Sequence, residues 1–338
     1  MRYIVIGAGA VGGAIGGRLA QSGNQVVLVA RGAHARALRA DGLRLDTPDE
    51  SLRLPVPVAE TPDEVELTPD DVLLLAVKVQ DSVAALDAWA HRPVAGGGTA
   101  GERLPLLCVQ NGVAGDDLAL RRFRRVYSVC LWLPAQYLTP GRVVAPCAPL
   151  TGMLHLGDHP ARADGTLDAA TLRPIAEDLA RSRFLAPLVP DVARWKYAKL
   201  LGNLANALEA LCGPMADDPR VAEVYGRVRA EGEAVLRAAG IPWTSPEDEE
   251  ALRADRMTMR PVADAETGGN SSWQSLRRGT GSIEADYLNG EIVLLGRRHG
   301  VATPWNETLQ RLANRAAAEG HAPGSLPVES LTRSVRDN

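Results

Sequence analysis

A lysine and two asparagines near the middle of the chain recur at a spacing that a helix would align. Lys199, Asn203 and Asn206 stand at positions i, i+4 and i+7, so a helix through this segment places all three on one face. An adjoining apolar face is formed by Ala198, Leu201, Ala205 and Leu208. Polar groups in such a helix are costly to bury unless they bind a ligand or hydrogen-bond to neighbouring helices. The stripe therefore predicts a binding surface, with helix–helix hydrogen bonds as the alternative.

A second group of polar residues lies further along the chain. Ser272 stands in Asn270–Gln274, before a helical pattern, where it is a candidate N-cap. Glu284 and Asp286 stand near another helix start, where acidic residues complement the helix dipole. These residues fit either local helix stabilisation or a ligand site.

The chain opens with an apolar run that leads directly into Gly7-Ala8-Gly9-Ala10-Val11-Gly12. This G-x-G-x-x-G sequence stands between a predicted buried strand and a predicted helix, the context that dinucleotide binding requires. Gly7 permits a tight turn, Gly9 lets the backbone approach a pyrophosphate, and Gly12 lets the helix pack closely on the strand. The N–H groups at the helix start then face the phosphates. We therefore predict that these six residues bind a dinucleotide.

The end of the second predicted strand, Gln25–Ala30, bears on which dinucleotide is bound. A cofactor without a 2′-phosphate usually meets an acidic residue near this point, whereas this chain has Ala30 followed by Arg31. A guanidinium binds a phosphate through paired, charge-assisted hydrogen bonds. Arg31 thus favours NADP(H) over NAD(H), with a solvated surface arginine as the alternative.

Lys78 and Asn111 follow two further strands of the predicted sheet. Ligands of open parallel sheets bind outside the carboxyl ends of the strands, so both side chains are candidates for the cofactor site, and Asn111 also for the substrate. The alternatives are a solvated strand end for Lys78 and a turn before Gly112 for Asn111.

The elements that must position these residues alternate between strand and helix in the first half of the chain. Buried strands are predicted over Asp71–Val77 and Leu104–Val109, and Leu52–Val58 reads as an edge strand because of its prolines. Beyond Val189 the pattern becomes helical throughout. We predict an α/β fold: an N-terminal Rossmann-type doubly wound sheet over residues 1–188, an all-helical substrate and catalytic domain over 189–320, and a loose tail over 321–338.

Composition limits the classes of function. The chain has 338 residues, 46% hydrophobic residues and a net charge of −4, which argues against a nucleic-acid partner. It has no stretch of about 20 apolar residues, so we expect no membrane span. No metal site is predicted, and its four scattered cysteines read as small buried hydrophobes. We expect no signal peptide before the first strand and a cytoplasmic location.

Over roughly residues 1–316 the chain resembles the ketopantoate reductase (2-dehydropantoate 2-reductase) family. The resemblance depends on the order and spacing of several short motifs, none of which is decisive alone. They are the G-x-G-x-x-G, Arg31, Lys78 in Ala-Val-Lys, Gln110-Asn111-Gly112, Lys199-Leu200-x-x-Asn203, Ser271-Ser272, Glu284-x-Asp286-x-x-Asn289-Gly290, and His299-Gly300-Val301-x-Thr303-Pro304-x-Asn306.

The resemblance implies NADPH-dependent reduction of 2-dehydropantoate to pantoate. Lys199 matches the family's proton donor, and Asn203 and Ser272 match substrate-binding positions. Lys78, Asn111 and Glu284 match positions near the cofactor, with Asn111 touching the substrate as well. We expect no partner beyond the small 2-oxo acid and NADPH, and either a monomer or a homodimer.

The segment after Asn203 departs from the family pattern, which commonly continues with three residues and then Asn-Pro-Leu. Here Asn206 follows one residue sooner and no proline is present. Asn206 can still fill the second asparagine's place, since i+3 and i+4 share a helix face. This leaves open a reductase that acts on a different 2-oxo acid or ketone, and a non-catalytic NADPH-sensing protein.

Overall fold

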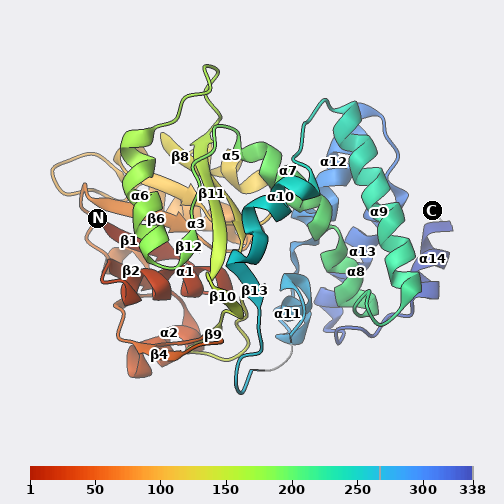
Figure 1. Cartoon of the computed structure of the whole chain (residues 1–338), viewed down its shortest axis with the longest axis horizontal. Coiled ribbons are helices and arrows are strands. Elements are labelled where there is room, and N and C mark those ends of the chain that lie inside the picture. The colour runs from red at the N-terminus through yellow and green to blue at the C-terminus, as the bar shows by residue number, and fades with distance from the viewer. Residues whose placement is uncertain (266–267, 337–338) are drawn as a thin grey trace. The chain divides into compact units, whose positions relative to one another are not determined.

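The computed structural model describes residues 1–265 and 268–336, and the chain divides into two compact units. Unit 1 comprises Met1–Lys196 and Ser245–Ala265, and unit 2 comprises Tyr197–Thr244 and Glu266–Asn338. Figure 1 shows a sheet flanked by helices in unit 1 and an all-helical arrangement in unit 2. The α/β class expected from the sequence is confirmed.

Unit 1 is built on an eight-stranded sheet with the order β12-β11-β8-β7-β6-β1-β2-β5. Its pairings are parallel except for β11, which runs antiparallel to β8. A parallel sheet needs crossover connections, and helices supply most of them here. The strands are β1 (Arg2–Ile6), β2 (Gln25–Val29), β5 (Val58–Ala59), β6 (Asp71–Leu75), β7 (Pro105–Cys108), β8 (Arg125–Trp132), β11 (Gly152–His159) and β12 (Phe184–Leu185).

Both faces of this sheet are covered, as its apolar strands require. Alternate residues of β1 belong to two different buried clusters: Tyr3 and Val5 to one, Ile4 and Ile6 to the other. Such alternation places one cluster on each face of the sheet. The helices of unit 1 are α1 (Ala10–Gln21), α2 (Gly32–Asp41), α3 (Ser82–Ala90), α4 (Ala100–Arg103), α5 (Ala114–Leu120), α6 (Ala169–Arg181) and α10 (Pro246–Arg253).

The predicted edge strand Leu52–Val58 is wrong as a single element. It is divided by Pro55-Val56-Pro57 into β4 (Ser51–Leu54) and β5, which pair in different sheets. Proline has no N–H to donate to a ladder, so the ladder stops there. β4 joins β3 (Leu43–Asp46) and β9 (Arg142–Val144) in a three-stranded sheet that the sequence patterns did not reveal.

The unit boundary differs from the predicted one in two places. It falls at Lys196, inside α7 (Val192–Asn203), instead of at residue 188. The segment Ser245–Ala265 was predicted as part of the helical domain, yet it clusters with unit 1. There β13 (Met257–Met259) pairs antiparallel with β10 (Cys147–Pro149). A three-residue strand leaves no clear periodic signal in the sequence.

Unit 2 surrounds a buried core of leucine, valine, isoleucine and alanine side chains. The helix predicted through Lys199, Asn203 and Asn206 is interrupted at Leu204 and divided into α7 and α8 (Ala205–Cys212). The helix start predicted near Glu284 and Asp286 is a short 3₁₀ turn, η4 (Glu284–Tyr287). The other helices are α9 (Pro219–Ala238), α11 (Ser271–Arg277), α12 (Asn289–His299), α13 (Pro304–Glu319) and α14 (Val328–Arg336).

The tail expected to be loose over 321–338 instead contains α14. Leu331 is fully buried and Val328 is 6% exposed, both within the core of unit 2. The approach to α14 is fixed by backbone hydrogen bonds, since the Gly324 and Leu326 amides donate to carbonyls of α8 at 2.9 Å. The few apolar residues of the tail recur at i, i+3 spacing, which suffices for one packed face.

Candidate active site

The glycine-rich turn joins β1 to α1, and two of its glycines are required by the fold itself. Gly7 has a φ of +101°, a region that side chains other than glycine's rarely adopt. A Cβ at Gly12 would lie 2.1 Å from the Gly7 carbonyl oxygen. Both positions therefore exclude larger residues before any ligand is considered.

Gly9 differs, because apart from its two chain neighbours no described residue has an atom within 4 Å of the place its Cβ would take. Gly9 is the N-cap of α1, and no described side chain caps that helix. The N–H groups of the first helical turn have no partner within the helix. The open space at Gly9 and these N–H groups fit a pyrophosphate at the helix start.

A buried histidine braces this turn, and sequence analysis missed it. His34 Nδ1 accepts a hydrogen bond from the Gly141 amide at 2.9 Å, and its Nε2 lies 2.8 Å from the Ala8 carbonyl oxygen. Because Nδ1 accepts, the proton of the neutral ring is on Nε2, which donates to Ala8. The ring also packs against Tyr137, with centroids 4.4 Å apart. His34 thus ties the middle of the turn to the loop before β9.

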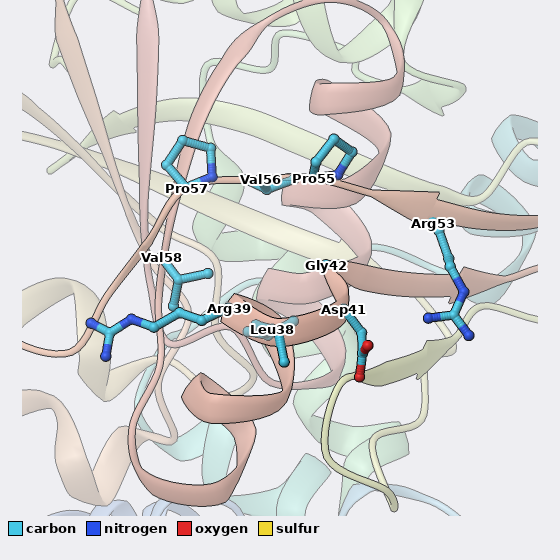
Figure 2. A pocket seen from close by; sticks show the side chains of 10 residues that line it. Leu38, Arg39, Asp41, Gly42, Arg53, Pro55, Val56, Pro57 and Val58 are labelled. Atoms are coloured by element: carbon cyan, nitrogen blue, oxygen red, sulfur yellow. The ribbon is translucent and has the colours of Figure 1, made fainter.

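Arg31 is the N-cap of α2 and stands two residues after Val29, the last residue of β2. Its side chain is exposed and makes no hydrogen bond or ion pair among the residues described. An open hollow of about 590 Å³ lies at the other end of α2, beside Gly42. In Figure 2, Arg39 and Arg53 extend from this hollow in opposite directions. Arg31 is not among the residues that line this hollow.

Lys78 and Asn111 stand at equivalent positions after neighbouring strands, as predicted. Leu75 pairs with Cys108 at the ends of β6 and β7, and each predicted residue follows three positions later. Both are half-buried. Gln110 joins the two strand ends, since its Nε2 donates to the Val77 carbonyl at 2.7 Å. The sheet therefore brings Lys78 and Asn111 to its carboxyl edge.

The predicted polar stripe lies in unit 2, on α7 and α8. Lys199, Asn203 and Asn206 are all half-buried. Leu204, between the two helices, keeps near-helical angles of φ −60° and ψ −22°, so the three residues remain on one helical face. The Nδ2 atom of Asn203 is buried and has no hydrogen-bond partner in the described structure.

Ser272 is also in unit 2, but it does not cap α11 as the sequence suggested. The cap is Asn270, whose Oδ1 accepts from the Ser272 and Trp273 amides at 3.0 Å. The Ser272 side chain lies inside the first turn and is fully buried, and its Oγ lacks a partner among the described residues. Buried polar atoms are nearly always paired, so both Asn203 and Ser272 have unused hydrogen-bonding capacity that a ligand can satisfy.

Glu284 is 2% exposed and opens η4 in unit 2. The nearby asparagines of the family motifs have structural roles instead. Asn289 Nδ2 donates to the Leu204 carbonyl at 3.2 Å and to Asn306 Oδ1 at 3.0 Å. Asn306 in turn donates to the Val228 carbonyl at 3.0 Å. These bonds fix the helices behind the stripe.

A buried ion pair in unit 1 was also missed. Lys196 Nζ lies 2.7 Å from Asp116 Oδ2, and their side chains are 3% and 5% exposed. Ser128 donates to the same oxygen at 2.6 Å. The pair joins α5 to the start of α7, the helix that continues to Lys199. An isolated lysine in the sequence gave no sign of this pairing.

No group of three or more potential metal-ligating side chains was found in the described ranges. Among those same residues, no helix is long and apolar enough to cross a bilayer. Three cysteines are buried and Cys212 is half-buried, and burial raises the pKa of the Cys212 thiol to about 12.

A Rossmann-type sheet with its glycine-rich turn, followed by a helical unit with a polar stripe, defines a two-unit oxidoreductase. Comparison with known proteins specifies it further. The family "Ketopantoate reductase PanE/ApbA" matches residues 3–159, and its C-terminal counterpart matches residues 191–317. The chain belongs to the ketopantoate reductase family.

Individual relatives extend over nearly the whole chain. The 2-dehydropantoate 2-reductase of Mesorhizobium japonicum is 28% identical over 347 residues, covering 94% of this chain and 98% of its own. A PanE/ApbA family ketopantoate reductase from Ralstonia eutropha has a TM-score of 0.75 at 28% identity, covering 95% and 99%. D-mandelate dehydrogenase, solved with NADH and anilino(oxo)acetate, shares the fold with a TM-score of 0.76 at 22% identity, covering 95% and 100%.

Proposed function

We propose that the protein reduces 2-dehydropantoate to pantoate with NADPH. The observation that supports this most is in unit 2: Asn203 and Ser272 have buried polar atoms without partners among the described residues. Both match family substrate positions, and Lys199 lies one helical turn from Asn203. The uncharged Asn203 and Ser272 side chains can hydrogen-bond to the carboxylate and the hydroxyl group of the substrate.

When bound, a nicotinamide cofactor would supply the hydride that reduces the carbonyl carbon of the substrate. Negative charge then develops on the substrate oxygen, and the Lys199 ammonium stabilises this charge and gives its proton to the oxygen. Such positioned acid catalysis is typically worth about 10²–10⁴-fold. Asn203, Asn206 and Ser272 orient the substrate.

The residues of unit 1 hold the cofactor. The six residues from Gly7 to Gly12 would hold the pyrophosphate, Lys78 would bind the cofactor, and Asn111 would bind the cofactor and the substrate. Arg31 favours NADPH, because its uncommitted guanidinium can pair with a 2′-phosphate. Glu284, a residue of unit 2, matches a family position near the cofactor.

Steady-state turnover of matched 2-oxo acids tests the proposal. The full chain is assayed by NADPH consumption with 2-dehydropantoate and with 3,3-dimethyl-2-oxobutanoate, which differs only by lacking the hydroxyl group. We expect kcat/KM to be higher for 2-dehydropantoate by about tenfold or more, the effect of one hydrogen bond in a desolvated site. Benzoylformate serves as an unrelated 2-oxo acid.

Two results would overturn the proposed reaction. Preference for either other 2-oxo acid would assign a different substrate to the same chemistry. Binding of NADPH without turnover of any of the three would indicate a protein that senses the cofactor without catalysis.

A further inference from the structure

Glu60, the residue directly after β5, has a carboxylate beside the end of β2, where β2 itself has no acidic residue. The two strands pair in parallel with Val29 opposite Ala59, and the Ala30 amide continues the ladder by donating to the Ala59 carbonyl at 3.0 Å. One step further in this register, Glu60 follows β5 as Ala30 follows β2. Parallel strands end at a common edge, so Glu60 lies beside the position where an acidic residue of β2 would meet a ribose 2′-hydroxyl.

Both carboxylate oxygens of Glu60 are engaged. Oε2 accepts from the Gly32 amide at 3.3 Å, and Oε1 accepts from Arg39 Nη1 at 2.6 Å. Arg39 also donates to Glu64 at 2.6 Å. The Glu60 side chain is 32% exposed, so a ligand can reach it. Since Gly32 follows Arg31 directly in the chain, the carboxylate lies beside the backbone that bears Arg31.

We propose that Glu60 opposes Arg31 in selecting the cofactor at the 2′ position of the adenosine ribose; this inference rests on the proposed function. The carboxylate accepts a hydrogen bond from a free 2′-hydroxyl and repels a 2′-phosphate. The Arg31 guanidinium instead attracts a 2′-phosphate. The chain therefore binds both cofactor forms, with a smaller preference for the phosphorylated one than Arg31 alone would give.

The size of this effect follows from the exposure of the groups. A like-charge contact close to solvent changes a binding constant by about three- to tenfold. Arg39 forms an ion pair with Glu60 and offsets part of its negative charge. This keeps the repulsion of a 2′-phosphate within that range. Removing the carboxylate charge should therefore raise selectivity for the 2′-phosphate by the same factor.

Calorimetric binding of two nucleotide fragments to the full chain tests the inference without catalysis. Adenosine 2′,5′-bisphosphate carries the 2′-phosphate, and 5′-AMP does not. For Glu60→Gln, we expect the ratio of the two affinities to rise by about three- to tenfold over the unsubstituted chain. Glu64→Gln is the matched control, because Glu64 shares Arg39 but does not contact Gly32 among the described hydrogen bonds; its ratio should not move.

Each other outcome contradicts the inference in a recognisable way. Equal changes in both affinities would assign Glu60 a merely structural role, and an equal shift in Glu64→Gln would assign the effect to Arg39. If thermal unfolding shows that Glu60→Gln is not folded, Glu60→Ala must give the same rise in ratio. If neither fragment binds the unsubstituted chain, the proposed cofactor site itself fails.

Discussion

Two glycines of the same turn should respond in opposite ways to alanine. Gly9 has a φ of −69° and a ψ of −153°, and open space surrounds the position of its absent Cβ among the described residues. Alanine there meets no steric conflict, and the lower entropy of the unfolded chain favours folding by about 0.4–1 kcal/mol. We therefore expect Gly9→Ala to fold with unchanged or slightly raised unfolding free energy.

The same substitution should nonetheless damage dinucleotide binding. The new methyl group occupies the space through which a pyrophosphate reaches the N–H groups of α1. Loss of one hydrogen bond to a charged group costs about 1.5–3 kcal/mol, which corresponds to a fall in affinity of about 10- to 150-fold. Calorimetric titration with NADPH measures this loss, and denaturant unfolding measures stability on the same sample.

Gly12→Ala is the matched comparison. Its Cβ would lie 2.1 Å from the Gly7 carbonyl oxygen, so the turn must shift, at a cost of about 1–3 kcal/mol or more in unfolding free energy. A Gly9→Ala protein that loses stability like Gly12→Ala, or that binds NADPH as tightly as the unsubstituted chain, would refute this division between ligand-driven and packing-driven glycines.

Two further predictions concern buried charges. Asp116→Asn leaves the Lys196 ammonium buried without its counter-charge, so the free energy of unfolding should fall by about 3–5 kcal/mol. Adding Lys196→Met to this variant should recover most of the lost free energy, as a double-mutant cycle measures. Losses that are purely additive in the cycle would contradict the pairing. At Asp46, burial opposes ionisation, but hydrogen bonds from Ser51, Arg44 and Arg142 outweigh it and hold its pKa below the ordinary 3.8. A carboxyl group whose pKa is lower in the folded chain than in the unfolded chain stabilises the fold at pH values above the unfolded-chain pKa. This stabilisation is lost as the pH falls through the folded-state pKa. Asp46→Asn should thus lower the free energy of unfolding by about 1–3 kcal/mol at neutral pH. The difference in this free energy between the variant and the unsubstituted chain should shrink below pH 3.8. Denaturant unfolding at several pH values measures it, and a difference that does not change with pH would count against this account.

The parts of the fold that sequence predicted well have long or repeated signals. The buried strands β1, β6 and β7 are continuous apolar runs, and their carboxyl ends locate Lys78 and Asn111. The helical character of unit 2 was equally visible, although the interruption at Leu204 was not. These patterns repeat over several residues, so a few exceptions do not obscure them.

The parts that were missed depend on contacts between residues distant in sequence. β13 is three residues long and exists because β10 offers it a partner. Glu60 and Ala30 become neighbours through the pairing of β2 with β5, and Asp116 meets Lys196 across 80 positions. Only the folded structure shows that Asn270, two residues before the predicted Ser272, caps α11.

The central claim is that the Lys199 ammonium assists reduction of the substrate carbonyl. Its most direct test compares kcat for 2-dehydropantoate in Lys199→Ala and in Arg194→Ala, which removes an exposed basic side chain from the same helix. We expect kcat to fall by about 10²–10⁴-fold in Lys199→Ala alone, with calorimetric NADPH affinity unchanged in both. Equal turnover in the two variants would show that Lys199 takes no part in the chemistry.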